Sequence, residues 1–131
     1  MIIRIDQKSN EPLYLQLRSQ IIASIAQGDL EPGDALPSVR SLARDLGINL
    51  HTVNKAYAVL RDEGYVVMRG RSGAYIADPA DNGLAQAEAG RARMDEALFA
   101  LAVENRAHGG SREDFIARAS VQADRAYKEE R

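Results

Sequence analysis

Apolar residues recur at helical spacing through two neighbouring stretches in the middle of the chain. They are three or four positions apart, which places each set on one face of a helix; the sets are Val39, Leu42, Ala43 and Leu46, and then Val53, Ala56, Tyr57 and Leu60. Ser38 and Asn49 suit helix N-caps, and Gly47 suits the left-handed residue that ends the first helix. The pattern therefore predicts two short helices joined by a tight turn at Gly47.

Two strand-like runs follow the second helix. Residues 65–68 and 74–77 are rich in β-branched and aromatic side chains, and the five residues between them include two glycines. This arrangement is a hairpin signal. Both charged residues of the loop, Arg69 and Arg71, are basic, and no acidic residue lies between Tyr65 and Ala77. Because phosphates attract such cations, we interpret the hairpin as a basic wing.

Helical spacing also predicts one helix before this motif and two helices after it. The first carries the stripe Leu13, Leu17, Ile21 and Ile25; we expect Asn10 to cap it and Gly28 to end it. The breaker-rich segment 78–83 marks the expected domain boundary. Residues 84–107 and a helix starting at Ser111 follow, and two helices of this length cannot enclose a core alone. The predicted fold is mainly α with a small β-hairpin wing: a winged helix-turn-helix domain over residues 1–79 and a two-helix tail over residues 80–131.

Charge is distributed unevenly along the chain. The net charge of the 131 residues is −2. Residues 35–77, however, carry six basic and three acidic groups, whereas residues 80–131 carry eight basic and ten acidic groups. The cationic surface is therefore concentrated where a nucleic-acid contact is expected.

Composition limits the remaining functions. The chain has no cysteine, no apolar run near the ~20 residues of a membrane span and no secretory signal at its start, so we expect a cytoplasmic protein with no membrane partner. Its two histidines, His51 and His108, fall on different predicted elements, and no cluster has metal-ligand spacing. We therefore predict no enzyme activity, no catalytic residue, no metal and no cofactor.

The order helix, turn, helix and wing presents the second helix to a DNA major groove. The polar face of that helix, at residues 51, 52, 54 and 55, is the candidate reading face, with the arginines at 40 and 44 beside it. Winged helices can also be protein-interaction modules that bind no nucleic acid. The basic residues of the first helix and of the wing favour DNA, since a protein-binding face is more often apolar.

Residues 10–79 resemble the winged helix-turn-helix domain of the GntR family of bacterial transcription regulators. The matching positions are Gly28, Leu30, Pro32, Gly33, Leu36, Pro37, Ser38, Arg40, Leu42, Ala43, Leu46, Gly47, Thr52, Val53, Ala56, Leu60 and Gly64. The runs Pro12-Leu13-Tyr14 and Lys55-Ala56-Tyr57, together with the short tail, are similar to the YtrA subfamily.

The resemblance implies a homodimer that binds double-stranded DNA at an inverted-repeat operator, and we expect a repressor. Helix 49–61 would enter the major groove and wing 69–73 would lie on the adjacent minor groove or backbone. The family match assigns DNA contacts to Arg40, Asn49, His51, Thr52, Asn54, Arg69 and Gly70, and geometry and charge add Arg44, Lys55 and Arg71 as phosphate partners. The tail would form the dimer, through Met94, Leu98, Leu101, Phe115 and Ile116.

Two positions depart from the subfamily's usual Asn-Pro-Asn-Thr turn. Leu50 replaces the proline and His51 replaces the second asparagine. His51 offers a different hydrogen-bond pattern to a base, so the operator sequence cannot be taken from relatives. The sequence neither identifies nor excludes a small-molecule effector, and it assigns no role to residues 1–9. Residues 2–5 suit a short extended segment.

Overall fold

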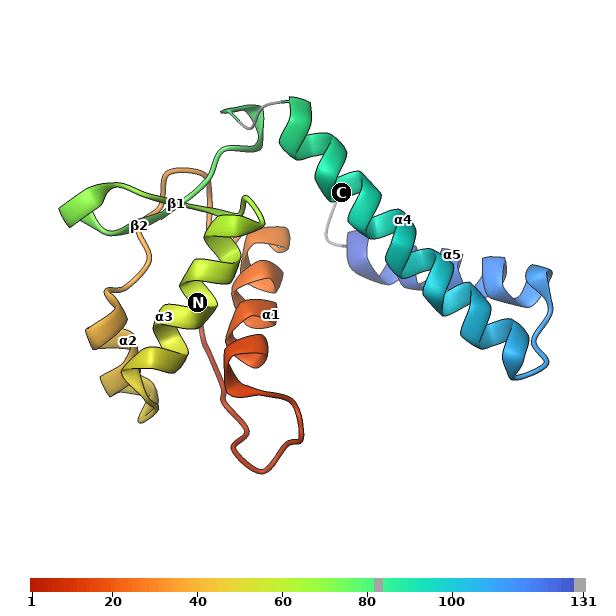
Figure 1. The fold of residues 1–131 in the computed structure, drawn as a ribbon, viewed down its shortest axis with the longest axis horizontal. Helices are drawn as coiled ribbons and strands as arrows, with labels where there is room; N and C mark the ends of the chain where they lie inside the picture. The colour runs from red at the N-terminus through yellow and green to blue at the C-terminus, as the bar shows by residue number, and fades with distance from the viewer. Residues whose placement is uncertain (82–83, 129–131) are drawn as a thin grey trace. The chain divides into compact units, whose positions relative to one another are not determined.

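The computed structural model describes residues 1–81 and 84–128, and the chain divides into two compact units, Met1–Gly83 and Leu84–Arg131 (Figure 1). The first unit contains α1 (Leu13–Ala26), α2 (Val39–Leu46), α3 (Leu50–Asp62), β1 (Val66–Met68), the 3-10 turn η1 (Gly70–Ser72), β2 (Ala74–Ile76) and η2 (Pro79–Asp81). The second contains α4 (Leu84–Ala107) and α5 (Arg112–Tyr127). The predicted fold, mainly helical with one small hairpin, is confirmed. Within the described ranges no helix has the length and apolar content that crossing a bilayer requires.

Local hydrogen bonds set the ends of α2 and α3. The Ser38 side chain accepts a bond from the Ser41 amide at 3.1 Å, and that of Asn49 accepts one from the His51 amide at 2.7 Å. Between the helices, Gly47 adopts φ 66°, a left-handed conformation that costs glycine little. The capped tight turn expected from the sequence is therefore confirmed, and α3 begins one residue after its N-cap.

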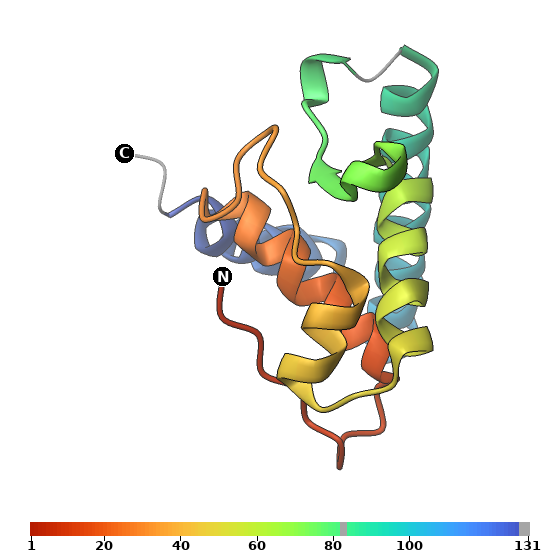
Figure 2. The same cartoon turned by 90° about the vertical axis from the view of Figure 1, so that its left-hand side faces the viewer.

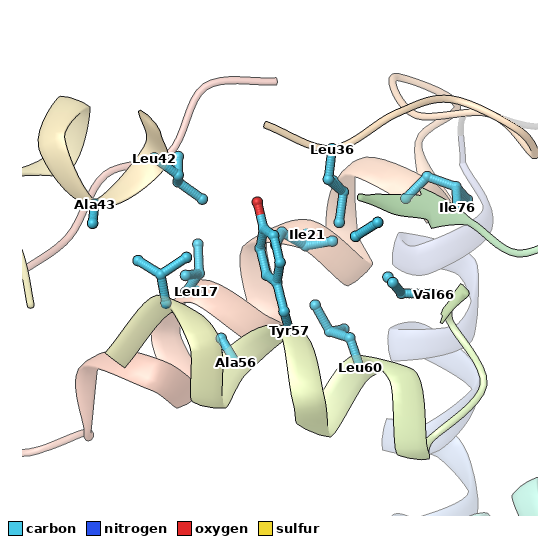
Figure 3. Close-up of a cluster of buried hydrophobic side chains, with 12 residues drawn as sticks. Leu17, Ile21, Leu36, Leu42, Ala43, Ala56, Tyr57, Leu60, Val66 and Ile76 are labelled. Atoms are coloured by element: carbon cyan, nitrogen blue, oxygen red, sulfur yellow. The ribbon is translucent and has the colours of Figure 1, made fainter. Parts of the chain in front are cut away.

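One hydrophobic core holds the first unit together (Figure 3). Helix α3 packs on α1 and α2, as Figures 1 and 2 show, and its chain continues into β1. All four apolar residues expected on its inner face are buried, and they meet Leu17 and Ile21 of α1 and Leu42 and Ala43 of α2. Burial of this apolar surface is the main favourable term that fixes α3 in place.

The N-terminal segment is attached to α1 by two glutamine side chains. The Gln20 amide accepts from the Arg4 backbone N–H at 2.8 Å and donates to its carbonyl at 2.6 Å. Gln16, which is buried, makes the equivalent pair of bonds with the backbone of Asp6, both at 2.9 Å. Ile3 and Ile5 pack against the core from this segment. The segment at residues 2–5 thus covers one flank of α1.

Asn10 does not cap α1, which corrects the expectation from the sequence. The helix starts after Pro12, whose φ of −54° and ψ of 141° are those of an extended residue, and no side chain caps it. The chain between the N-terminal segment and α1 instead turns through Asp6 and Ser9: the Ser9 amide donates to the Asp6 carbonyl at 3.3 Å. Because Pro12 disfavours a helical conformation at the residue before it, the helix cannot begin as early as Asn10 requires.

The wing is an antiparallel hairpin with a third short segment beside it. Val66 pairs with Ile76 and Met68 with Ala74. Ala35 forms an isolated antiparallel bridge to Tyr75, and the amide of Leu36 donates to the carbonyl of Ala74 at 2.9 Å. The loop before α2 is therefore fastened to the wing strand, which fixes the wing relative to the helices.

The second unit is a helical hairpin whose connection between α4 and α5 is held by hydrogen bonds. The amide of Gly110 donates to the carbonyl of Asn105 at 2.8 Å, and the Asn105 side chain donates to the carbonyl of Ser111 at 3.1 Å. The Ser111 hydroxyl then accepts from the Asp114 amide at 3.0 Å, as expected for the start of α5. These bonds cap the end of α4 and the start of α5, where backbone groups lack partners within the helix.

Candidate nucleic-acid interface

The polar positions predicted for the start of α3 lie together at the surface. Asn49, His51 and Asn54 are exposed, and Thr52 is half-buried. The inner side of the same turn is occupied by Val53 and Ala56, both fully buried. The side chains available for contact are therefore short and carry both hydrogen-bond donors and acceptors, as readout of base edges requires.

Two predicted arginines lie on α2, the helix that packs beside α3. Arg40 and Arg44 are both exposed and are four residues apart, so they share the outer face of α2. Among the described residues neither takes part in an ion pair, unlike Arg18, Arg61 and Arg118. Their charges are consequently available to an anionic partner.

Lys55 is held in a specific position by an aromatic ring. Its Nζ atom lies 4.1 Å from the ring centroid of Tyr14, in the first turn of α1. Attraction between a cation and an aromatic face restricts the long lysine side chain. The ammonium group is thereby kept on the side of α3 that adjoins α1, whereas Arg40 and Arg44 lie on α2.

The wing carries the remaining predicted residues. Arg69 and Arg71 are exposed, and the Arg69 guanidinium carbon lies 5.2 Å from the ring centroid of Tyr75. The Tyr75 hydroxyl also donates to the Ser72 carbonyl at 3.1 Å, so one tyrosine contacts both sides of the loop. Gly70 has φ 54°, and a Cβ atom built there would meet nothing within 4 Å. Glycine at this position is therefore favoured by backbone conformation. In Figure 1 the wing and α2 lie on the same side of the first unit.

Two internal interactions brace these elements. Tyr57 lies among the core side chains (Figure 3), and its hydroxyl donates to the carbonyl of Pro37, just before α2, at 2.7 Å. Burial raises the pKa of Tyr57 well above its ordinary value. Arg18 of α1 donates two bonds to the Glu63 carboxylate, at 2.6 and 3.0 Å, which join α1 to the end of α3. The bond to Glu63 raises the pKa of Arg18, although burial partly opposes this. The surface residues thus project from a braced scaffold.

Sequence reasoning missed the part that two tyrosines play at this surface. Tyr14 counted only as a point of family resemblance, and Tyr75 only as a strand former. Each in fact lies under a cation that the sequence did identify. Spacing along the chain gave no signal for either pair, since Tyr14 and Lys55 belong to different helices.

The second unit presents a different kind of surface. Met94, Leu98, Leu101 and Ile116 are exposed, while Phe115 is half-buried. Further exposed apolar side chains, which were not among the predicted contact residues, are Phe99, Val103, Val121 and Tyr127. Apolar residues on several sides of a helix are typical of a helix that packs on more than one neighbour.

Comparison with known proteins identifies the family. Residues 13–76 match the profile of the bacterial regulatory proteins of the gntR family. The HTH-type transcriptional regulator Rv1152 of Mycobacterium tuberculosis is 44% identical over 87 residues, which cover 65% of this chain and 72% of Rv1152. The solved structure of YtrA from Sulfolobus acidocaldarius, a GntR-family transcription factor, is 34% identical with a TM-score of 0.65 and covers 94% of this chain and 97% of that one. The chain belongs to the gntR family.

Within the family, the chain is similar to YtrA-type regulators. The HTH-type transcriptional repressor YtrA of Bacillus subtilis is 42% identical over 86 residues, which span 65% of each protein. The match to the Sulfolobus YtrA structure extends through most of the chain, beyond the helix-turn-helix region. The resemblance to the family and to its YtrA-like members, inferred from the sequence, is therefore confirmed, and the gntR-family chain is a transcription regulator.

Proposed function

We propose that this gntR-family regulator binds an inverted-repeat DNA operator as a homodimer and acts in the cytoplasm as a repressor. One α3 helix from each protomer enters a major groove, and each wing lies on the adjacent minor groove or backbone. Half-sites then lie about one helical turn, ~10 base pairs, or a small multiple apart. A repressor bound across a promoter excludes the polymerase by occupying the same DNA.

The grouping of cations and short polar side chains around the start of α3 is the observation that carries this proposal. Asn49, His51 and Asn54 are exposed on α3, with Arg40 exposed on the neighbouring helix. The scaffold behind them is braced by the Arg18–Glu63 pair. A rigid, polar and cationic helix end is suited to reading base edges while neighbouring cations hold the phosphates.

The arginines divide into two roles by their position. Arg40 lies at the start of α2, and we assign it to a guanine contact through its two-pronged guanidinium group. Arg44 and Arg71, with the wing residues Arg69 and Gly70, are assigned to the backbone and minor groove. His51 and Thr52 complete the base-reading set, and because His51 is a departure from relatives, it gives this regulator its own operator preference.

Homodimerisation through the tail is supported by the exposed apolar residues of α4 and α5. Leu98 is 43% exposed and Met94 and Leu101 are each 55% exposed. Such side chains are stabilised when a second copy covers them. Dimerisation also compensates for the modest positive charge of one DNA-binding unit. A dimer that binds two half-sites at once has a much higher affinity for DNA than either protomer alone.

The test first selects a duplex operator from a random-sequence library. Binding of the protein to this operator is then measured by fluorescence anisotropy over a range of salt concentrations. We expect affinity to fall linearly with salt on a logarithmic plot. Arg40→Ala should weaken binding by about 1–3 kcal/mol and relax the preference at one base pair. Arg71→Ala should weaken all sequences alike and reduce the salt slope by about 2, because the dimer loses one phosphate contact from each protomer.

A protein-interaction module without DNA binding is the alternative. It predicts that no sequence is enriched, and that retention on DNA is as weak for the wild type as for Arg71→Ala. Lys128→Gln is the matched control, because it removes one positive charge from the exposed end of α5. If Lys128→Gln weakened binding as much as Arg71→Ala, the wing would have no special role.

A further inference from the structure

An open hollow of about 570 Å³ lies between the first turns of α1 and α3. Its wall on the α3 side consists of Asn49, His51, Thr52 and Lys55, and its wall on the α1 side includes Tyr14. None of the residues that line it is acidic. The hollow therefore combines a lysine ammonium with several hydrogen-bond donors at the edge of the proposed reading face.

The hydroxyl of Tyr14 differs from those of two other tyrosines of the first unit. Tyr57 and Tyr75 donate their hydroxyl protons to the backbone carbonyls of Pro37 and Ser72. No residue in the described ranges forms a hydrogen bond with the Tyr14 hydroxyl, although Tyr14 itself is half-buried. A phenol fixed by its ring, with its hydroxyl available to a ligand, is a well-placed donor to an anion.

Lys55 contributes the charge at the same place. Its Nζ atom is held 4.1 Å from the Tyr14 ring centroid, which places the ammonium beside the hollow. Lysine is a compact point charge, which suits a phosphate better than the flat edge of a base. Holding the side chain on a ring also lowers the ordering cost when an anion binds.

We propose that this hollow seats one backbone phosphate of the bound DNA, with the Tyr14 hydroxyl and the Lys55 ammonium as its two donors. The inference rests on the proposed operator binding and adds a contact from α1, outside the helix-turn-helix. The seat lies beside the reading residues of α3, so it fixes how far α3 enters the groove. Tyr14 is thereby both a phosphate contact and the residue that positions Lys55.

The test combines protein variants with chemically altered DNA. On the selected operator, single phosphates are replaced one at a time by neutral methylphosphonates, and binding is measured for the wild type, Tyr14→Phe and Lys55→Gln. Tyr14→Phe keeps the ring under Lys55 and removes only the hydroxyl. Both variants should bind the unmodified operator about a hundredfold more weakly, because the dimer loses two hydrogen bonds to charged groups, one from each protomer, at about tenfold each. Lys128→Gln should bind like the wild type.

The decisive result is a shared position on the DNA. A methylphosphonate at one position in each half-site should weaken the wild type and leave Tyr14→Phe and Lys55→Gln nearly unaffected, because the contact it removes is already absent. The salt slope should fall by about 2 in Lys55→Gln, one phosphate contact for each protomer of the dimer, and stay constant in Tyr14→Phe. If the variants lose sensitivity at different phosphates, or bind like the wild type, the seat does not exist. If the wild type selects no operator at all, the proposed function itself fails.

Discussion

Tyr57→Phe removes a single oxygen atom from the core of the first unit. The Tyr57 side chain is 1% exposed, and its hydroxyl donates to the Pro37 carbonyl at 2.7 Å. Phenylalanine keeps the ring, so no cavity of ring size opens. The loss is that of a buried hydrogen bond whose acceptor remains unpaired, about 1–2 kcal/mol. For a unit of this length, Tm should fall by about 4–8 °C for each kcal/mol.

The same substitution should change how stability depends on pH. Burial raises the pKa of Tyr57 above 10.0 in the folded protein, whereas the unfolded chain loses this proton near pH 10. Above pH 10 the unfolded state therefore binds fewer protons than the folded state, and stability falls as pH rises. The contribution of the protonated Tyr57 to the free energy of unfolding is fully present below pH 10. Above pH 10 the free energy of unfolding falls by at most about 1.4 kcal/mol per pH unit from this group. Tyr57→Phe does not lose stability in this way, because phenylalanine has no hydroxyl to titrate.

Urea unfolding followed by circular dichroism at pH 7, 9, 10 and 11, at one fixed protein concentration, measures both effects. Tyr57→Phe should be less stable than the wild type at pH 7, and the difference should shrink between pH 10 and 11. Tyr65→Phe, which removes a hydroxyl from a half-buried residue of the same unit, is the control. Equal stability at pH 7 would refute the hydrogen-bond contribution. Parallel wild-type and Tyr57→Phe curves from pH 9 to 11 would refute the burial argument.

Three further substitutions test the turn between α2 and α3, the connection between α4 and α5, and the ion pair between α1 and the end of α3. Gly47→Ala places a side chain at φ 66° without a steric clash, so it should cost about 1–2 kcal/mol of conformational strain, measured as a lower Tm. Gly110→Ala is different, because its Cβ would overlap the Asn105 side chain and force it to move. We expect loss of the hydrogen bond from Asn105 to the Ser111 carbonyl, seen as faster amide exchange at the start of α5. Arg18→Met breaks the partly exposed pair with Glu63 and should cost about 1 kcal/mol, and added salt should destabilise the wild type more than this variant.

Sequence reasoning succeeded where local rules determine the structure. The turn between α2 and α3 follows from Ser38, Gly47 and Asn49, each of which acts on its immediate neighbours. The inner face of α3 follows from spacing alone, because only one side of a helix can face the core. The hairpin followed from strand-forming residues on either side of a glycine-containing loop.

It failed where polar side chains act across the chain. Helical spacing did not single out Gln16 and Gln20, yet their side-chain amides bind the backbone of the N-terminal segment. The bridge from Ala35 to Tyr75 involves a single residue of the loop, so no alternation of apolar and polar residues marks it in the sequence. Asn10 misled because it is a good N-cap by residue type, although Pro12 delays the helix. Tyr14 could have been suspected only by asking which cations lie near aromatic rings, which requires coordinates.

The most direct test is to capture genomic DNA fragments on the purified protein, with an Arg40→Ala/Arg69→Ala double variant handled in parallel, and to sequence what is retained. We predict that the wild type enriches an inverted repeat with half-sites about one helical turn or a small multiple apart, and that the double variant does not. Failure of the wild type to enrich any sequence above background at low salt would contradict operator binding. Equal enrichment by both proteins would show that α2 and the wing are not the contacting surface.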